Sequence, residues 1–290
     1  MKPAPFEYIA AESLEHALAV KARHGDEASF LAGGQSLIPA MNFRLAQPAL
    51  LLDLKPLAAL DYVRGEPGGA LRIGALTLHR TLERHPLIAR HQPLLHEAVP
   101  FVAHPQIRTR GTLGGNLAHA DPASEYPAVM AALGARLKAQ SVRGERWIGA
   151  ADFFVGVFTT ALAADELLVE VELPALPPRT GSCFLEESRR QGDYALMGVA
   201  ASISLSESGE CAGARLAFCS AGETPVSATG AASALVGRRL GAEDLRAAAA
   251  AAAAQLQPSG NVHASSGFRR HLAGVLARRA LEKALARAGA

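Results

Sequence analysis

The sequence has few of the residue types on which several kinds of site depend. Its 290 residues include only three cysteines, Cys183, Cys211 and Cys219, which lie 28 and 8 residues apart and form no C-x-x-C pair. Structural zinc sites and iron–sulfur clusters need closely spaced cysteines, so we expect this chain alone to build neither. An odd number of cysteines without such spacing favours buried, reduced thiols.

Charge of one sign, aromatic residues and long apolar runs are also scarce. The 29 basic and 27 acidic residues give a net charge of +2 and are scattered along the chain, which argues against a nucleic acid or an anionic membrane as partner. No stretch approaches the roughly 18 apolar residues of a membrane span. Glu7, Glu12 and Glu15 interrupt the segment in which a signal peptide needs an apolar core. We therefore expect a cytoplasmic protein without membrane insertion.

Glycine and proline, with 27 and 17 residues, divide the chain into recognisable parts. Pro174, Pro177 and Pro178 cannot sit inside a regular element and predict a linker at 174–181. Downstream, the sequence predicts antiparallel strands and then helices, with strands at 195–205 and 214–220 and helices at 228–236, 242–256 and 271–287.

Upstream of the linker, helical and strand patterns alternate. The predicted helices lie at 13–23, with Ser13 as N-cap, and at 77–85, 94–99 and 127–133. The predicted strands lie at 28–31, 50–54, 70–76 and 167–173, with a hairpin at 136–141 and 145–148. Residues 36–44 predict a turn and a short helical piece broken near Pro39, and residues 101–125 form the most irregular stretch.

Two loops with adjacent glycines are the most informative local features. Gly33-Gly34 follows a predicted strand and precedes Gln35 and Ser36, and the second pair stands in the string RGTLGGNLAHADPASE, from 110 to 125. Glycines let successive backbone N–H groups converge on an anion, while hydroxyl and amide side chains add donors. Neither loop matches the Rossmann or P-loop pattern. Together they predict a dinucleotide held by neutral donors, although each pair alone is typical of an ordinary turn.

Other kinds of chemistry find little support in the sequence. His79, His85, His91, His96 and His104 fit no metal-ligand spacing, so we expect surface or packing roles for them and no metal site. No serine stands in a G-x-S-x-G motif. We therefore assign no catalytic residue.

Three strings carry a resemblance to a known family. AGGQSLIPAMNFR (32–44), IRTRGTLGGNLAHADPASEYPA (107–128) and RRQGDYALMGVAA (189–201) occur in family order, and the chain resembles the medium, FAD-binding subunit of the molybdenum hydroxylases over essentially its whole length. The resemblance implies an α+β protein with a vanillyl-alcohol-oxidase (PCMH)-type FAD-binding domain at 1–176, made of α/β subdomains at about 1–56 and 57–176. A C-terminal domain of antiparallel sheet and helices at 177–290 would follow.

The same resemblance assigns cofactor contacts to particular residues. The pyrophosphate would lie against the first loop, and the second loop would complete the diphosphate and ribityl contacts. Two acidic residues would occupy ribose and ribityl positions. Apolar residues would pack near the rings, with an aromatic residue beside the isoalloxazine. These residues are Leu31, Ala32, Gly33, Gly34, Gln35, Ser36, Leu37, Val102, Ile107, Thr112, Gly114, Gly115, Asn116, Ala118, Asp121, Glu125, Leu167 and Tyr194.

One position departs from the family pattern. Many relatives have a lysine two residues after the aromatic that begins the strand leading into the R-R-x-G-D segment, whereas this chain reads Phe184, Leu185, Glu186. A carboxylate near the ring would disfavour an anionic reduced flavin. The alternative is a solvated glutamate at a strand edge.

The resemblance implies an electron-transfer flavoprotein subunit. A large partner would hold a molybdenum–pterin centre, a small partner would hold two [2Fe–2S] clusters, and FAD in this chain would pass electrons to an external acceptor, in a dimer of heterotrimers. Two alternatives stay open. One is a stand-alone flavin oxidase with His104 or His119 as its base, and the other is a scaffold subunit that has lost the cofactor.

Overall fold

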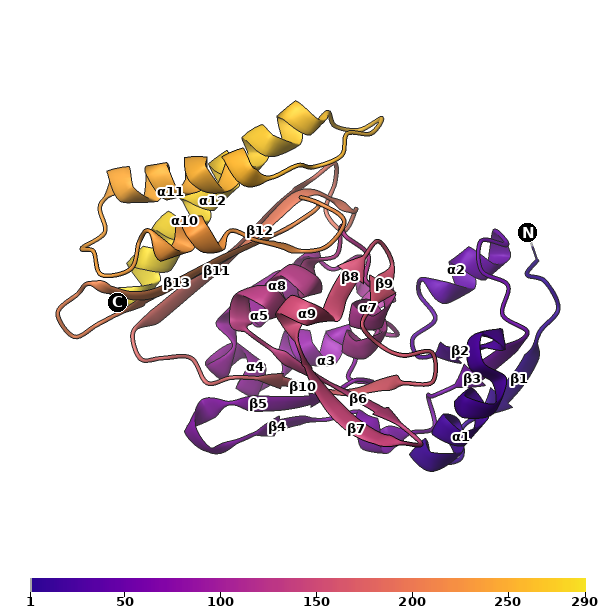
Figure 1. The fold of residues 1–290 in the computed structure, drawn as a ribbon. Coiled ribbons are helices and arrows are strands. Elements are labelled where there is room, and N and C mark those ends of the chain that lie inside the picture. The colour runs from indigo at the N-terminus through magenta and orange to yellow at the C-terminus, as the bar shows by residue number, and fades with distance from the viewer. Residues whose placement is uncertain (1) are drawn as a thin grey trace.

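The computed structural model describes residues 2–290, which form three larger sheets and one two-stranded sheet, β8-β9 (Figure 1). The strands are β1 (Glu7–Ala10), β2 (Ala28–Leu31), β3 (Leu50–Asp53), β4 (Val63–Gly65), β5 (Leu71–Gly74), β6 (Arg136–Ser141), β7 (Gly144–Gly149), β8 (Phe154–Gly156), β9 (Thr159–Thr160), β10 (Leu167–Leu173), β11 (Thr180–Ser188), β12 (Ala195–Leu205), β13 (Cys211–Cys219) and β14 (Val226–Ser227). The helices are α1 (Leu14–His24), α2 (Leu37–Asn42), α3 (His79–Arg84), α4 (Pro86–His91), α5 (Pro93–Ala98), α6 (Pro105–Arg108), α7 (Leu113–His119), α8 (Glu125–Leu133), α9 (Ala150–Phe153), α10 (Thr229–Ser233), α11 (Ala242–Gln255) and α12 (Ser266–Ala288). Short 3-10 turns lie at Gly25–Glu27, Ala58–Leu60, Pro67–Gly69 and Val99–Phe101.

The first sheet is small and parallel. β1 and β2 both pair with the central β3, and α1 packs against β2 and β3. Ser13 caps α1 as predicted, because its hydroxyl accepts a hydrogen bond from the His16 N–H at 3.1 Å. Ala17 and Leu18 of α1 are buried in one cluster with Leu167 and Val169 of β10, so this lobe packs directly on the second sheet.

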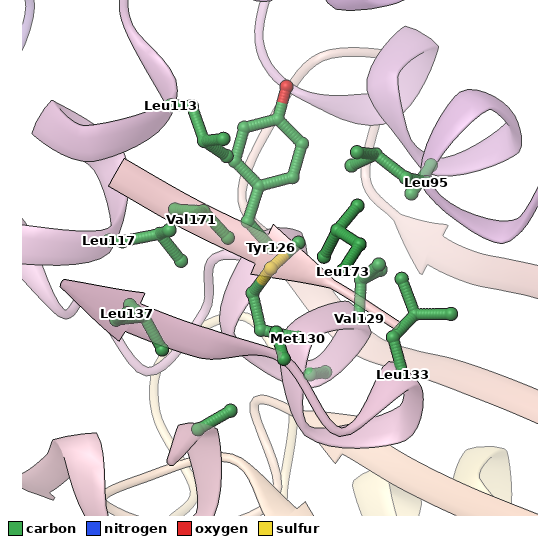
Figure 2. Close-up of a cluster of buried hydrophobic side chains, with 14 of the residues drawn as sticks. Leu95, Leu113, Leu117, Tyr126, Val129, Met130, Leu133, Leu137, Val171 and Leu173 are labelled. Carbon is green, nitrogen blue, oxygen red and sulfur yellow. The ribbon is translucent and has the colours of Figure 1, made fainter. Parts of the chain in front are cut away.

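The second sheet is antiparallel, in the order β4-β5-β10-β6-β7, and supports the largest core. A bulge in β10 between Leu168 and Glu170 interrupts its alternation. Val171 and Leu173 then point into the core, where α8 packs with Tyr126 and Met130 (Figure 2). All four of these side chains are fully buried.

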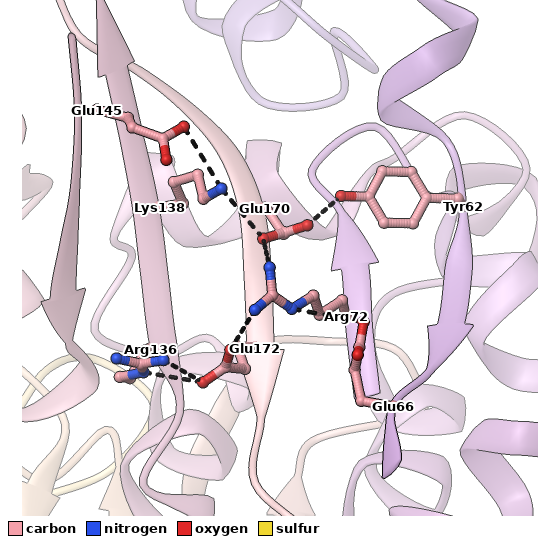
Figure 3. Close-up of polar contacts among 8 residues, drawn as sticks. All are labelled: Tyr62, Glu66, Arg72, Arg136, Lys138, Glu145, Glu170 and Glu172. Carbon is pink, nitrogen blue, oxygen red and sulfur yellow. Dashed lines mark hydrogen bonds and ion pairs between the residues drawn. The ribbon is translucent and has the colours of Figure 1, made fainter. Parts of the chain in front are cut away.

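The other face of the second sheet is polar. Arg72 of β5 lies 3.3 Å from the Glu170 carboxylate and 3.2 Å from that of Glu172, both on β10 (Figure 3). Arg136 of β6 lies 2.6 Å from Glu172. Lys138, Glu145, Glu66 and Tyr62 extend the same network (Figure 3). Beyond the bulge in β10, Val171 and Leu173 therefore face the helices, whereas Glu170 and Glu172 face this polar network.

The C-terminal sheet, β11-β12-β13-β14, is antiparallel as predicted and is buried on both faces. On one face, Cys183 and Val199 pack with α11 and α12, the long yellow helix of Figure 1. On the other face, Phe184, Ala200 and Ala217 belong to the same core cluster as Tyr126 of α8. The C-terminal domain therefore completes the core of the domain before it.

Several predicted boundaries were wrong. Pro39 does not break α2, because it lies in the first helical turn, where its missing N–H needs no partner. α12 begins at Ser266 behind the Ser265 cap, five residues earlier than predicted, and α10 spans only Thr229–Ser233. The irregular stretch contains α6 and α7. The three cysteines are buried and free, as predicted.

Candidate functional site

A cavity of about 650 Å³ lies between the small parallel sheet, the second sheet and the loop before β12. Five segments supply most of its walls. These are the loop after β2, the end of β5 with the start of α3, residues 102–107, the stretch from Gly111 to Glu125, and the chain leading into β10. Gly192, Asp193 and Tyr194 add a wall from the C-terminal domain.

The first glycine loop leaves its backbone donors free. None of the N–H groups of Gly33, Gly34, Gln35 and Ser36 donates a hydrogen bond to any residue between 2 and 290. Gly34 adopts φ +72°, which glycine tolerates, and the Gln35 side chain donates to the Gly33 carbonyl at 2.9 Å. Four consecutive unpaired N–H groups on a cavity wall are suited to an anion.

Gly33 also joins the two glycine loops. A Cβ at this position would lie 2.3 Å from the Arg110 carbonyl oxygen and 2.8 Å from the Gly111 Cα. The two backbones therefore approach more closely than any side chain permits. The contact joins the loop after β2 to the stretch that leads into α7.

The second glycine pair stands inside α7 and uses its N–H groups within the chain. The Leu113 N–H donates to the Thr77 carbonyl at 2.9 Å, the Gly114 N–H to the Ala75 carbonyl at 2.8 Å, and the Gly115 N–H to the Thr112 hydroxyl oxygen at 3.1 Å. A Cβ on Gly114 would lie 2.5 Å from that of Ala75. This pair therefore provides close packing of α7 on the end of β5, and the donors left for a ligand are side-chain groups.

Side chains after α7 bring acidic groups to the same cavity. The Ser124 hydroxyl donates to Asn116 Oδ1 at 2.7 Å, and Asp121 accepts from the Ala123 N–H at 2.9 Å. Glu125 begins α8 and is 6% exposed. Burial, helped by the negative charge of Asp121, raises the pKa of Glu125 to about 7.

Beneath these residues, a buried histidine supports the wall. His79 Nδ1 lies 3.2 Å from the Tyr126 hydroxyl, and the His79 N–H donates to the Gly111 carbonyl at 3.0 Å. Burial lowers the pKa of His79 to about 3, with the Arg108 charge acting in the same direction, so the ring is neutral. The packing role predicted for His79 is confirmed, although it also lines the cavity.

The C-terminal domain reaches the cavity through one loop. Gly192 has φ +80°, and a Cβ there would lie 2.4 Å from His104 Nδ1. Asp193 is held by Arg189 at 2.9 Å and accepts from the Tyr194 N–H at 3.0 Å. The Tyr194 side chain is 69% exposed at the cavity edge.

Most of the predicted site residues come together at this cavity. Those that line it are Ala32, Gly33, Gly34, Gln35, Ser36, Leu37, Val102, Ile107, Thr112, Gly114, Gly115, Asn116, Ala118, Asp121, Glu125, Leu167 and Tyr194. Leu31 and Glu186 do not line it. Leu31 ends β2, and its carbonyl accepts from the Leu54 N–H. Both carboxyl oxygens of Glu186 are buried, so the carboxyl group is not solvated, and Glu186 is not among the residues that line the cavity.

Sequence reasoning missed several lining residues, including Lys21, Leu162, Glu166 and Gly192. Lys21 is the one lysine or arginine among the described lining residues. Its Nζ donates to the Ala28 carbonyl at 2.6 Å and the Gly25 carbonyl at 2.8 Å, so the ammonium group is hydrogen-bonded to backbone carbonyls of the chain. The site is therefore built from neutral donors.

No group of three or more histidine, cysteine or acidic side chains between residues 2 and 290 is arranged to hold a metal ion. Among the helices described, none is both long and apolar enough to cross a membrane.

Comparison with known proteins identifies the family. A family described as "FAD binding domain in molybdopterin dehydrogenase" matches residues 4–176, and one described as "CO dehydrogenase flavoprotein C-terminal domain" matches residues 182–284. The 6-hydroxypseudooxynicotine dehydrogenase complex subunit alpha of Paenarthrobacter nicotinovorans is 43% identical and aligns over 99% of this chain and 97% of its own length. The carbon monoxide dehydrogenase medium chain of Hydrogenophaga pseudoflava is 35% identical over 99% of both chains.

Solved structures agree with these sequence matches. Carbon monoxide dehydrogenase from Hydrogenophaga pseudoflava, in a form that lacks the Mo-pyranopterin moiety of its cofactor, superposes with a TM-score of 0.95 at 36% identity over 99% of both chains. Quinoline 2-oxidoreductase from Pseudomonas putida 86 gives a TM-score of 0.93 at 38% identity over 99% of both chains. The chain therefore belongs to the FAD-binding medium subunits of the molybdenum hydroxylases, a family of oxidoreductases, as its sequence motifs had indicated.

Proposed function

We propose that this chain is the electron-transfer subunit of a molybdenum-containing hydroxylase and that its FAD occupies the cavity described above. The observation that carries this proposal is the row of four unpaired N–H groups from Gly33 to Ser36 on the cavity wall. A pyrophosphate accepts such donors without needing a cationic side chain. The scarcity of lysine and arginine around the cavity agrees with that chemistry.

The close contact between the two glycine loops is the second supporting feature. The contact of Gly33 with the Arg110–Gly111 backbone sets the spacing of the two loops. We infer that Thr112 and Asn116 then donate from the side opposite the first loop, through a hydroxyl and an amide that both line the cavity. These two side chains would donate hydrogen bonds to the ligand, because the N–H groups at the start of α7 already donate to other residues of the chain.

We assign the remaining contacts from the resemblance to the family. Asp121 and Glu125 would form hydrogen bonds with sugar and ribityl hydroxyls, and Val102, Ile107 and Leu167 would cover apolar ring surface. Tyr194 would lie beside the isoalloxazine. Bound FAD supplies the electron-accepting and electron-donating chemistry, and the chain supplies orientation, electrostatics and exclusion of water.

The electrons must come from elsewhere, because the three cysteines are dispersed and buried. We propose a small partner with [2Fe–2S] clusters as donor, a large partner with the molybdenum–pterin centre, and a dimer of such heterotrimers in the cytoplasm. Names of relatives support this arrangement, since they include medium chains and a subunit of a dehydrogenase complex. We also propose domain boundaries at 1–176, with subdomains at about 1–56 and 57–176, and at 177–290.

The test is a reconstitution of the purified chain with FAD, followed by native mass spectrometry of the complex. We expect a flavin absorbance spectrum with one FAD per chain, and companion chains that carry the clusters and molybdenum. A chain that retains no flavin after reconstitution would overturn the proposal. A chain that occurs alone and whose flavin is bleached directly by a small substrate would favour the stand-alone oxidase.

A further inference from the structure

A second acidic residue, Glu186, has a buried carboxyl group that no hydrogen bond from the described residues stabilises. Both carboxyl oxygens of Glu186 are buried, and neither has a hydrogen-bond partner among residues 2–290. An ionised carboxylate is very costly to bury without donors, whereas a neutral carboxylic acid is much less so. The environment of Glu186 therefore favours its protonated form.

The sheet register explains which groups face Glu186. Glu186 pairs with Gly198 of β12, and Gly198 pairs with Cys219 of β13, so these three residues form one row across the C-terminal sheet. A Cβ on Gly198 would lie 3.8 Å from Glu186 Cγ and 2.4 Å from Cys219 Sγ. The glycine thus makes room for the Cys219 thiol, and the Glu186 side chain lies at ordinary contact distance from the same position.

The face of this row turns toward the cavity wall. Phe184 lies two residues before Glu186 on the same face of β11 and, like Cys219, packs in the cluster that contains Tyr126 of α8. α8 lies on β12 and β13, and Glu125 is its first residue. Glu186 therefore lies, with Cys219 in the same row, on the face of the sheet against which α8 packs, and Glu125 is the residue that begins α8.

The two carboxyls differ in their access to the cavity. Glu125 lines the cavity and has Asp121 and Tyr126 as further titratable neighbours, whereas Glu186 does not reach the cavity surface. Burial, and secondarily the charge of Glu125, raises the pKa of Glu186 to about 9, above the value of about 7 for Glu125. Ionisation of one carboxyl opposes ionisation of the other, so the two titrate as a pair.

We propose that Glu125 and Glu186 form a proton-holding pair in the wall of the cavity, in which Glu186 is the inner acid, protonated at neutral pH, and Glu125 exchanges its proton with the cavity. A ligand that covers Glu125 removes water from it and disfavours its carboxylate, so binding takes up a proton from solvent. No other bond is made or broken. The link to FAD rests on the proposed function, but the protonation of the pair does not.

Infrared spectroscopy of the flavin-free and flavin-loaded chain tests the pair directly. Between pH 6 and pH 8, roughly the range in which an unperturbed glutamate is fully ionised, we expect one carboxylic-acid C=O band that does not change and is lost in Glu186→Gln. A second acid band should titrate near pH 7 and be lost in Glu125→Gln. Glu187→Gln is the matched control, since Glu187 is the exposed next residue of β11 and should leave both bands unchanged.

Titration calorimetry with FAD in buffers of different ionisation enthalpy tests the exchange with the cavity. Near pH 7 about half of the Glu125 carboxyls are ionised, so binding should take up as much as half a proton, and above that pH the Kd should rise by up to about ten-fold per pH unit. Both effects should vanish in Glu125→Gln and persist in Glu187→Gln.

The two tests separate this inference from the proposed function. If FAD binds but only carboxylate bands are present at pH 7, the pair is refuted and the proposed function stands. If the acid bands are present and FAD does not bind, the proposed function is refuted and the protonated pair stands. Acid bands together with a pH-independent Kd would refute the exchange of Glu125 with the cavity.

Discussion

Replacing Gly33 with alanine would place a methyl group where the chain itself already lies. The added Cβ would be 2.3 Å from the Arg110 carbonyl oxygen, whereas ordinary contacts begin at 3.4 Å. The two loops must therefore separate by about 1.1 Å, the difference between these two distances. The φ of Gly33 lies outside the left-handed region, so this steric contact is the only conformational cost.

The size of the effect follows from the atoms involved. Both near neighbours of the new methyl group are backbone atoms, which cannot rotate away as a side chain would. Overpacking of this kind costs about 1–3 kcal/mol. If the whole cost falls on the loop geometry that binds FAD, the Kd for FAD rises by about 5- to 150-fold.

Fluorescence titration of the flavin-free protein with FAD measures this change, and thermal unfolding of the same samples shows whether the fold is intact. Gly267→Ala is the matched control, because Gly267 lies in α12 and a Cβ there meets nothing within 4 Å. A Gly33→Ala protein that binds FAD with the Kd of the wild type would refute the reasoning.

Three further predictions concern stability and thiol chemistry. Tyr126→Phe removes the buried hydrogen bond to His79 and should lower the free energy of unfolding by about 1 kcal/mol in urea denaturation. The pKa of Glu186 rises from 4.5 in the unfolded chain to about 9 in the folded one, so the folded state binds more protons between these values and its stability falls as pH rises through them. Glu186→Gln should flatten that slope in thermal unfolding measured from pH 5 to pH 9, and a slope equal to that of the wild type would contradict the assignment. The three buried thiols should react with a thiol reagent only after unfolding, and rapid labelling of the native protein would contradict their burial.

The parts of the fold that could be predicted are those whose burial is periodic. β10 has the predicted bounds, and in its second half Val171 and Leu173 face the core while Glu170 and Glu172 face the polar network. β1 gave no such pattern, since its residues are mostly exposed and its position depends on pairing with β3. α7 was hidden by its glycines, and its first turn is fixed by carbonyl groups of Ala75 and Thr77, far away in sequence.

The candidate site divides in the same way. Adjacent glycines identified both loops, because glycine is the residue that permits two backbones to come into close contact. The contact of Gly33 with Gly111 agrees with this expectation. His79 and Glu166 reach the cavity only through tertiary packing, so no local pattern indicated them. Glu186 was singled out by its departure from the family pattern, but the burial of its carboxyl group depends on the register of three strands.

The core shared between the two domains limits how they can be exchanged. A fragment ending near residue 176 would keep both glycine loops, yet it would lose Tyr194 from the cavity and expose the part of the core that Phe184, Ala200 and Ala217 cover. The two domains of this chain are therefore not interchangeable modules. A chimera between relatives would preserve the cavity only if residues on both sides of this shared core were transferred together.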